Sequence, residues 1–491
     1  YLKDLRVLPQ VERMGWLVLR IIKEDSDAEI LVRAYRALIA RGWDGTLRKP
    51  HPSVAALVSS WYGGVLGVGE YTFSYGISNW LVFGVPYYLA ALIFALLLAG
   101  RAQRARVLSL PEQLRQAYGS GAGALAAGVV VATTLPAAYL LTVGLLLGLA
   151  FDLPLWQGVL AGALFAVVLN WAGGLHSVVR SNLLQFGLMY GGFAILLGSL
   201  MLEHGGLGFL RANLPANHLT WSGGRPLQAI LVWYLIALAT LVEPTFYLHC
   251  FAAKSPQVAR RGLLISIVAW CGFDALTTFS GLYARALLDP TLGLSAEAYP
   301  RLAAQTLPPG LLGLFYVALF STVLSTIDSY LFLSATSLGP DLLGQLGDRW
   351  RRWRRTAAGP TTASATAPPS PASGDGQRRL TRVGLLLSAG LASGIALVAR
   401  SVVDIWHDFG TIGTATLLVP AVASFFPRLR LSPRGALLGM ALTLPVALVW
   451  TLSRRFSTTG EHLLGVEPIF PALGLGLLVW GIDRLRGRRT R

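Results

Sequence analysis

The sequence predicts an all-α integral membrane protein, because of its composition, its long apolar runs and the charge of the loops between them. Hydrophobic residues make up 54% of the 491 residues, and charged residues only 13%. A soluble domain carries about 25% charged residues, whereas a bilayer core about 30 Å thick requires runs of about 20 apolar residues. Such runs recur along the chain with basic loops between them, which indicates a polytopic membrane protein.

About twelve apolar runs are long enough to be transmembrane helices. We place them near residues 53–76, 79–100, 121–150, 154–172, 178–202, 227–252, 261–287, 311–338, 383–400, 402–426, 433–452 and 465–484. Residues 1–50 are charged, and Arg20 interrupts their best apolar stretch, so we expect an amphipathic cytoplasmic segment there. Residues 356–377 are rich in Pro, Ala, Ser and Thr, which predicts a disordered linker.

Basic residues gather in alternate loops, which sets the expected orientation. One set of loops contains Arg101, Arg260, Arg428 and the tail 484–491, whereas the other set is poor in Arg and holds Glu203. The positive-inside rule places the basic set, and with it both termini, in the cytoplasm. We therefore expect a multi-pass protein of the bacterial cytoplasmic (inner) membrane. The net charge of +17 follows this rule, so the expected partners are the lipid bilayer and a small-molecule substrate, with no nucleic acid and no obligatory protein partner.

The reactive residue types give no sign of an enzyme. Cys250 and Cys271 cannot form a disulfide framework, and the seven histidines lack the His-x-x-x-His spacing of a metal enzyme. The nearest catalytic candidates are Asp274 and the pair Asp404 and His407, for which a role as buried or interfacial polar groups is the better interpretation. We expect no catalytic residues, and no metal beyond a coupling ion.

Two of the expected spans carry signals for a broken helix. The first span contains Ser59 and Ser60 followed by Gly63, Gly64 and Gly67, which permit an unwound turn or close helix packing. The sixth span contains Glu243-Pro244, where proline removes a backbone donor and a carboxylate lies in an apolar run. Interrupted helices at corresponding positions of two halves are the usual sign of a midplane site in an inverted-repeat transporter.

These two spans open successive groups of five. We expect a first inverted repeat over residues 53–202 and a second over 227–426, the latter including the linker 356–377. A repeat of five spans reverses direction across the membrane, so the two halves must be inverted relative to each other. Residues 433–491 would then form two accessory helices and a basic cytoplasmic tail.

The eighth span carries the best candidate for an ion site. Thr322, Ser325, Thr326 and Ser329 recur at i, i+3, i+4 and i+7, so they share one helix face, and Asp328 lies in an adjoining column. Hydroxyl and carbonyl oxygens are ligands that suit a hard cation such as sodium. The alternative is that these hydroxyls bond back to carbonyls of the preceding turn.

The chain resembles the sodium:solute symporter family in five segments that follow one another in the family's order. They are SSWYGGVLGVGEYTFSYG (59–76), LSLPEQLRQAYG (108–119), GGLHSVVRSNLLQ (173–185), FAAKSPQVARRG (251–262) and STIDSYLFLSATSLGPDL (325–342). The resemblance implies a LeuT-like core of five plus five helices, with sodium as the coupling ion.

The resemblance also implies which residues bind the ion. The family's sodium ligands match the hydroxyls of Ser325 and Thr326 and the carbonyls of Thr322, Leu57 and Ser60. Substrate-binding residues are expected in the two broken spans, at Ser59, Tyr62, Thr240 and Glu243.

Two departures from the family pattern affect what can be carried over. Asn182 stands where the family commonly has an Asp linked to a second sodium, which argues against a second ion. Ile236 and Thr240 replace the Trp and Tyr of the proline-transporting branch, so proline is not the expected substrate.

The function that the sequence predicts is sodium-coupled secondary active symport, importing a small polar organic solute by alternating access. One alternative is a proton-coupled symporter of the same fold, with Glu70, Glu243 or Asp328 as the proton carrier. The other is a non-transporting membrane sensor that retains a transporter fold. The substrate itself is left open at this stage.

Overall fold

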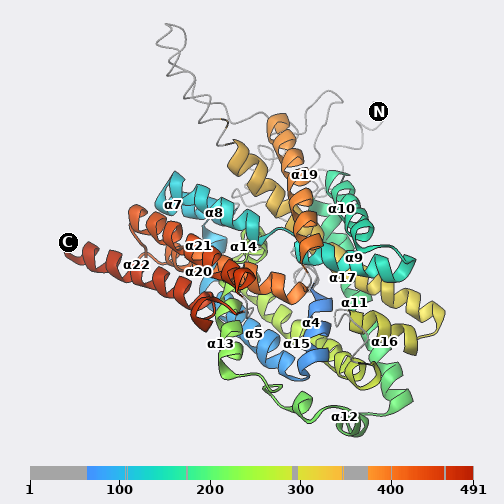
Figure 1. Ribbon diagram of the computed structural model, residues 1–491. Helices are drawn as coiled ribbons and strands as arrows, with labels where there is room; N and C mark the ends of the chain where they lie inside the picture. The colour runs from blue at the N-terminus through green and yellow to red at the C-terminus, as the bar shows by residue number, and fades with distance from the viewer. Residues whose placement is uncertain are drawn as a thin grey trace, which may run out of the picture.

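The computed structural model describes residues 64–489, apart from 106, 108, 173–174, 290–296, 345–346, 348–373, 400 and 458–460. All regular secondary structure in this part of the chain is helical. Figure 1 shows the helices gathered into one bundle, with α7 and α12 at opposite ends. Helix α7 lies in a loop of the basic set, expected in the cytoplasm, and α12 lies in a loop of the set poor in Arg, expected outside. Their positions at opposite ends therefore agree with the orientation expected from loop charge.

The helices up to residue 219 include those of the first five expected spans. They are α4 (Val65–Tyr75), η2 (Trp80–Gly84), α5 (Val85–Ile93), η3 (Phe94–Leu98), α6 (Ala99–Arg104), α7 (Leu110–Tyr118), α8 (Ser120–Thr133), α9 (Ala137–Phe151), α10 (Leu155–Ala172), α11 (Leu175–His204), α12 (Leu207–Asn213) and η4 (Ala216–Leu219). The stretch η2 to α6 is one continuous rod in which two π-helical segments alternate with α-helix.

The remaining helices complete the bundle. They are α13 (Leu227–Ile236), η5 (Ala237–Leu241), α14 (Pro244–Ala252), α15 (Pro256–Leu287), α16 (Ala298–Thr306), α17 (Pro309–Thr336), η7 (Ser337–Gly344), α19 (Gly374–Val398), α20 (Val402–Ser424), α21 (Pro433–Phe456), η8 (Leu463–Gly465) and α22 (Ile469–Arg489). Of the expected linker 356–377, residues 356–373 lie outside the described residues. Its last four, 374–377, belong to α19, so here the expectation of disorder was wrong.

Eight helical stretches of the described chain are long and apolar enough to cross a membrane. They are Trp80–Arg104, Ser120–Phe151, Gln185–His204, Leu227–Phe251, Pro256–Leu287, Pro309–Gly344, Arg379–Val398 and Pro433–Phe456. All of them overlap expected spans, which confirms a multi-pass membrane protein. The total of about twelve stays a prediction, since α10, α20 and α22 are not among the eight and only part of the first span is described.

Large apolar side chains cover much of the outer surface. Leu164 on α10 is 66% exposed and Val268 on α15 is 72% exposed, and they are typical of many Leu, Val, Ile and Phe residues on these helices. A soluble protein would lose stability by leaving so much apolar area in water. In a bilayer the same side chains contact lipid, so the exterior agrees with the membrane assignment.

Serine side chains define the beginnings of four helices. Ser109, Ser255, Ser401 and Ser432 each accept a hydrogen bond from the backbone N–H three residues later, at the starts of α7, α15, α20 and α21. Such N-caps satisfy donors that the first helical turn leaves unpaired. The cap at Ser401 lies close to the site described below.

The sixth expected span is broken where the sequence predicted it. Helix η5 ends at Leu241, Glu243 is extended (φ −65°, ψ 116°), and α14 begins at Pro244. Proline suits the first helical position because its missing N–H has no intrahelical partner there. The Tyr247 hydroxyl donates a hydrogen bond of 2.7 Å to the Leu241 carbonyl, which the break leaves without a helical donor.

A second break interrupts the third expected span, and the sequence analysis missed it. Helix α8 ends at Thr133 and α9 begins at Ala137, with Pro136 directly before it. The span expected over 121–150 is confirmed as Ser120–Phe151, but no break was foreseen within it. At the end of α8, the Val130 carbonyl accepts hydrogen bonds from both the N–H (2.9 Å) and the hydroxyl (2.7 Å) of Thr134.

Candidate functional site

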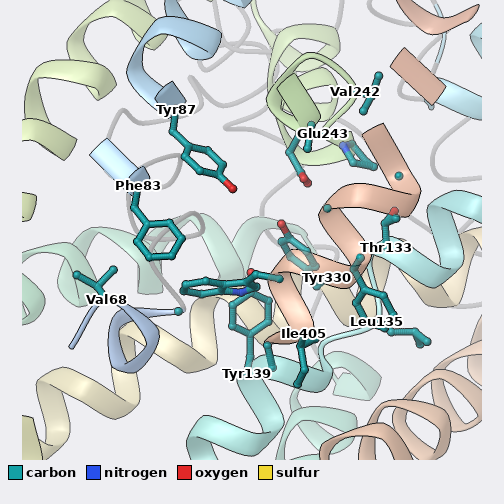
Figure 2. Close-up of a pocket in the computed structure, with 18 of the residues that line it drawn as sticks. Val68, Phe83, Tyr87, Thr133, Leu135, Tyr139, Val242, Glu243, Tyr330 and Ile405 are labelled. Atoms are coloured by element: carbon teal, nitrogen blue, oxygen red, sulfur yellow. The ribbon is translucent and has the colours of Figure 1, made fainter. Parts of the chain in front are cut away.

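A cavity of about 180 Å³ lies where the two breaks face α4, α5, α15, α17 and α20. Aromatic rings form most of its wall: Phe83, Tyr87, Tyr88, Tyr139, Trp270, Tyr330, Trp406 and Phe409. Figure 2 shows the hydroxyls of Tyr87 and Tyr330 and the carboxyl of Glu243 directed toward one central space. Mostly apolar walls with a few convergent polar groups are typical of small-molecule sites.

Two carboxylic acids, Glu243 and Asp274, line the cavity. Glu243 caps α14, since its Oε1 accepts hydrogen bonds from the Thr245 N–H at 3.4 Å and the Thr245 hydroxyl at 3.2 Å. Asp274 of α15 accepts a hydrogen bond from the Tyr88 hydroxyl. Among the described lining residues there is no Lys or Arg.

The first expected span reaches the cavity through a close contact with α20. Gly64 and Val68 of this span line the cavity, and the ring of Trp406 lies directly against Gly64 and Gly67. Gly67 was singled out from the sequence, where its absent side chain left two interpretations open, an unwound turn or close packing. Gly67 lies inside the regular helix α4, so close packing is what the described part of this span shows.

The hydroxyl stripe predicted on the eighth span is buried on α17. Thr322, Ser325 and Thr326 are each at most 1% exposed. The hydroxyls of Ser325 and Thr326 donate hydrogen bonds to the Thr322 carbonyl oxygen, at 3.0 and 3.4 Å. This is the bonding pattern that the sequence analysis held as its alternative. It also brings three oxygens together, and each hydroxyl that donates its hydrogen keeps two lone pairs as acceptors.

Four of the residues predicted to bind ion or substrate lie outside the described part of the chain. They are Leu57, Ser59, Ser60 and Tyr62, and the side chain of Asn182 is not described either. Their assignments stay predictions, as do those of Thr322, Ser325 and Thr326.

Of the two substrate-binding residues predicted in the sixth span, the structure places one at the cavity. Glu243 lines it, whereas Thr240 is fully buried and is not among the lining residues. The Thr240 hydroxyl oxygen has no hydrogen-bond partner among the described residues.

The acids proposed as proton carriers lie in three separate places. Glu70 accepts a hydrogen bond of 2.7 Å from the Ser401 hydroxyl at the start of α20. Asp328 accepts one of 3.1 Å from the Asn170 side chain of α10. Glu243 alone of the three lines the cavity.

Most of the wall could not be identified from the sequence. The aromatic residues come from five helical stretches far apart in the sequence, so no local pattern connects one stretch with another. Asp274 did carry a signal, an acid in an apolar run, and was interpreted as a buried polar group. Pro136 was a second available signal, because it marks the break that brings Thr133 and Leu135 to the cavity.

Comparisons with known proteins agree with the fold. A model of the sodium:solute symporter family matches residues 53–351. The sodium/pantothenate symporter of Haemophilus influenzae is 27% identical over 198 residues, which are 38% of this chain and 40% of that protein. The Homo sapiens sodium-coupled monocarboxylate transporter 1 is 27% identical over 218 residues, 39% of this chain and 34% of that protein. The chain thus aligns with less than half of either relative.

Two solved structures share the architecture. A Na⁺-coupled sialic acid symporter in a substrate-bound outward-open state superposes with a TM-score of 0.64 at 15% identity, covering 87% of this chain and 89% of that one. A nucleobase-cation-symport-1 family transporter in a closed conformation gives 0.55 at 13% identity, covering 88% and 93%. These similarities confirm the predicted LeuT-like fold. Because the family match extends over more than half of the chain and the fold agrees with it, this chain belongs to the sodium:solute symporter family, whose members compared here are transporters rather than enzymes.

Proposed function

We propose that this protein is a sodium-coupled secondary active symporter that imports a small polar organic solute across the bacterial cytoplasmic membrane. The observation that carries the proposal is an aromatic cavity, bounded by broken helices, close to a buried hydroxyl cluster on α17. Breaks of this kind are tolerated in a membrane only where protein or a water-filled site satisfies the freed backbone. Transporters use such breaks to bind ions and substrates near the midplane.

Sodium would bind between α17 and the first broken span. Its proposed ligands are the hydroxyls of Ser325 and Thr326 and the carbonyls of Thr322, Leu57 and Ser60. A hard cation of this size takes oxygen ligands at about 2.4 Å, so two of them at right angles lie about 3.4 Å apart. The oxygen separations of 3.0 and 3.4 Å at Thr322 are close to that value.

The cavity supports a small solute with a positively charged group. Its volume of about 180 Å³ slightly exceeds the roughly 150 Å³ of a cavity that holds one benzene ring. Cations are attracted to the faces of Trp and Tyr rings, most strongly where water is excluded. Glu243 and Asp274 would add charge complementarity. We therefore propose an amine, a quaternary ammonium compound or a compact zwitterion.

The substrates in the relatives' names do not suit this wall equally well. Pantothenate and monocarboxylates carry a carboxylate, which would meet Glu243 and Asp274 without a Lys or Arg among the described lining residues. Like charges at short range disfavour binding. We propose that this chain selects differently from those two relatives.

Transport would proceed by alternating access. Sodium binding would hold the first broken span against α17 and keep the cavity open to the outside until solute binds. At a membrane potential of about 100 mV, each charge moved inward contributes roughly 2.3 kcal/mol. That energy alone supports about fiftyfold accumulation of the solute.

A thermal-shift screen of the purified full chain tests both ion and solute. We expect sodium, but not potassium, to raise the unfolding temperature, and small amines to raise it further in sodium while carboxylates do not. The double variant Ser325→Ala/Thr326→Ala should lose the sodium effect. Thr336→Ala is the matched control, since its hydroxyl also bonds back to the preceding turn, at Phe332, but lies at the end of α17. A sodium effect that survives the double variant would refute the proposed ligands.

Proton coupling is the second candidate, because Asp328 and Glu70 are partly buried acids away from the cavity. Uptake into proteoliposomes at fixed membrane potential separates the two candidates. If uptake is unchanged when potassium replaces sodium, the sodium proposal fails and the proton candidate stands. If solute binds but no uptake occurs under either gradient, the chain is a sensor rather than a transporter.

A further inference from the structure

Two histidines and a glutamate meet at the end of α20, outside the proposed transport site. His407 belongs to α20, whereas His462 and Glu467 belong to the connection between α21 and α22. Glu467 Oε2 lies 3.1 Å from His407 Nε2 and 3.6 Å from His462 Nε2. One ligand atom from each residue lies within 4.8 Å of the other two. Three donors converging on one point from two elements is the geometry of a metal site.

The outer partners of both rings leave Nε2 as the inward-facing nitrogen. His407 Nδ1 lies 3.3 Å from the Asp408 carboxylate, and His462 Nδ1 lies 3.3 Å from the Trp450 carbonyl oxygen. An acceptor at Nδ1 holds the hydrogen on that nitrogen. Metal-binding histidines in proteins almost always make such a bond, to a carboxylate or a backbone carbonyl, through the nitrogen that does not bind the metal.

Burial and charge also suit a cation at this point. The side chains of His407 and His462 are 12% and 10% exposed, and that of Glu467 is 28% exposed, so the site is enclosed yet open on the glutamate side. Glu467 is the carboxylate of the cluster, and its negative charge suits a bound cation.

We propose that His407, His462 and Glu467 form a regulatory site for a divalent transition metal of the zinc class. Two imidazoles and one carboxylate, with water as the fourth ligand, are a known zinc ligand set. Calcium and magnesium prefer all-oxygen sites, so they should not compete. The metal would replace the hydrogen between His407 Nε2 and Glu467 Oε2, and that proton would leave to solvent.

The site would act on transport through Trp406, the neighbour of His407. Trp406 packs against Gly64 and Gly67 of α4 and lines the cavity. A metal bridge from His407 to the α21–α22 connection would fix α20 to the accessory helices. If α20 must move relative to the accessory helices during alternating access, this bridge would slow the movement. Zinc should therefore inhibit transport of the solute. This consequence rests on the proposed function, whereas the metal site itself does not.

Metal binding is tested first, on the purified full chain after chelator treatment. Isothermal titration should show one zinc ion per chain and no binding of magnesium or calcium. Glu467→Gln and His462→Gln should each weaken zinc binding at least tenfold. His204→Gln is the matched control, since His204 lies 3.8 Å from Glu203 at the end of α11, and it should leave binding unchanged. Cobalt(II) should give the visible absorption of a tetrahedral site in the wild type and lose it in Glu467→Gln.

Two results would overturn the proposal: no zinc binding to a folded wild-type protein, or binding that persists undiminished in both ligand variants. In the latter case the cluster is an ion-pair network only. A transport assay then tests regulation, with zinc expected to slow uptake severalfold in the wild type and not in Glu467→Gln. Zinc binding without uptake under any gradient would refute the proposed function and leave the site standing. Uptake that zinc does not affect would refute the regulatory role.

Discussion

Gly64 and Gly67 present a bare backbone face to the ring of Trp406. A Cβ atom at Gly64 would lie 1.4 Å from Cζ2 of that ring, and one at Gly67 would lie 2.7 Å from Cζ3. Neither distance is physically possible without movement of the ring or of a helix. The two glycines therefore set how closely α4 and α20 approach at the cavity wall.

We predict that Gly64→Ala destabilises the protein and impairs transport. Overpacking of this kind costs about 1–3 kcal/mol, and displacement of Trp406 would also narrow the cavity. The unfolding temperature and the uptake rate should both fall. Gly128→Ala in α8 is the control, because no heavy atom lies within 4 Å of a Cβ built there. If the two variants are equally stable, the close contact between Gly64 and Trp406 does not determine the stability of the protein.

At the residue scale, periodicity was informative on single helices only. The stripe of Thr322, Ser325 and Thr326 could be predicted because one helix carries all three at regular spacing. Tyr87, Tyr139 and Tyr330 come from three helices, and only the packing of those helices brings them together. Glu243 was predictable for a separate reason, since an acid before a proline in an apolar run has few structural explanations.

The break between η5 and α14 is held in place by its own side chains. Glu243 caps the helix that follows, and Tyr247 satisfies the carbonyl that the preceding helix leaves free. Both bonds are local, so the break does not depend on a bound ligand for its backbone hydrogen bonding. Such a break can remain formed while the surrounding helices move.

We predict that Tyr247→Phe weakens this break. The ring would stay packed, but the buried Leu241 carbonyl would lose its 2.7 Å hydrogen bond. An unsatisfied buried acceptor costs about 1–3 kcal/mol, so the unfolding temperature should fall. Tyr234→Phe in α13 of the same span is the control, since no hydrogen bond of its hydroxyl is found among the described residues. If Tyr234→Phe is as destabilising, the loss does not come from the break.

At the element scale, proline was the most reliable signal, and it was used incompletely. Pro244 identified the break in the sixth span. Pro136 marks an equivalent break between α8 and α9, but it lies in an uninterrupted apolar run from 121 to 150, and length alone suggested one long span. Pro244 follows an acid, Glu243, which is unusual in an apolar run and drew attention to the break. Pro136 follows an apolar residue, Leu135, so its break was not recognised.

The molecule as a whole has two chemically distinct ends. Loop charge predicts that α12 lies outside the cell and that Arg428, between α20 and α21, lies inside. The described fold places α12 and α7 at opposite ends of the bundle, as this prediction requires (Figure 1). Fold class and span order could be predicted because they follow from hydropathy, whereas helix packing follows from shape and could not.

We predict that a cysteine at Asn213, at the exposed end of α12, reacts with a membrane-impermeant maleimide on intact cells. A cysteine at Arg428 should react only after the membrane is opened. Both positions are exposed in the structure, so accessibility differs only by side. The native Cys250 and Cys271 would first be replaced by serine or alanine. The expected orientation places the α21–α22 connection, and with it the zinc site, outside the cell. The reverse labelling pattern would show the opposite orientation, with the zinc site in the cytoplasm.

Helix α20 meets three neighbours with a single face. Trp406, Gly410 and Gly413 follow one another at i, i+4 and i+7, and a Cβ at either glycine would lie 2.7 Å from a methyl carbon of Ile236 or Thr133. Each residue of an α-helix turns the chain by about 100°. Inserting or deleting one residue between Ser401 and Trp406 would therefore rotate the tryptophan away from α4 and His407 away from its two partners. Natural variation along this stretch should consist of substitutions, with its length unchanged in every homologue that retains both sites.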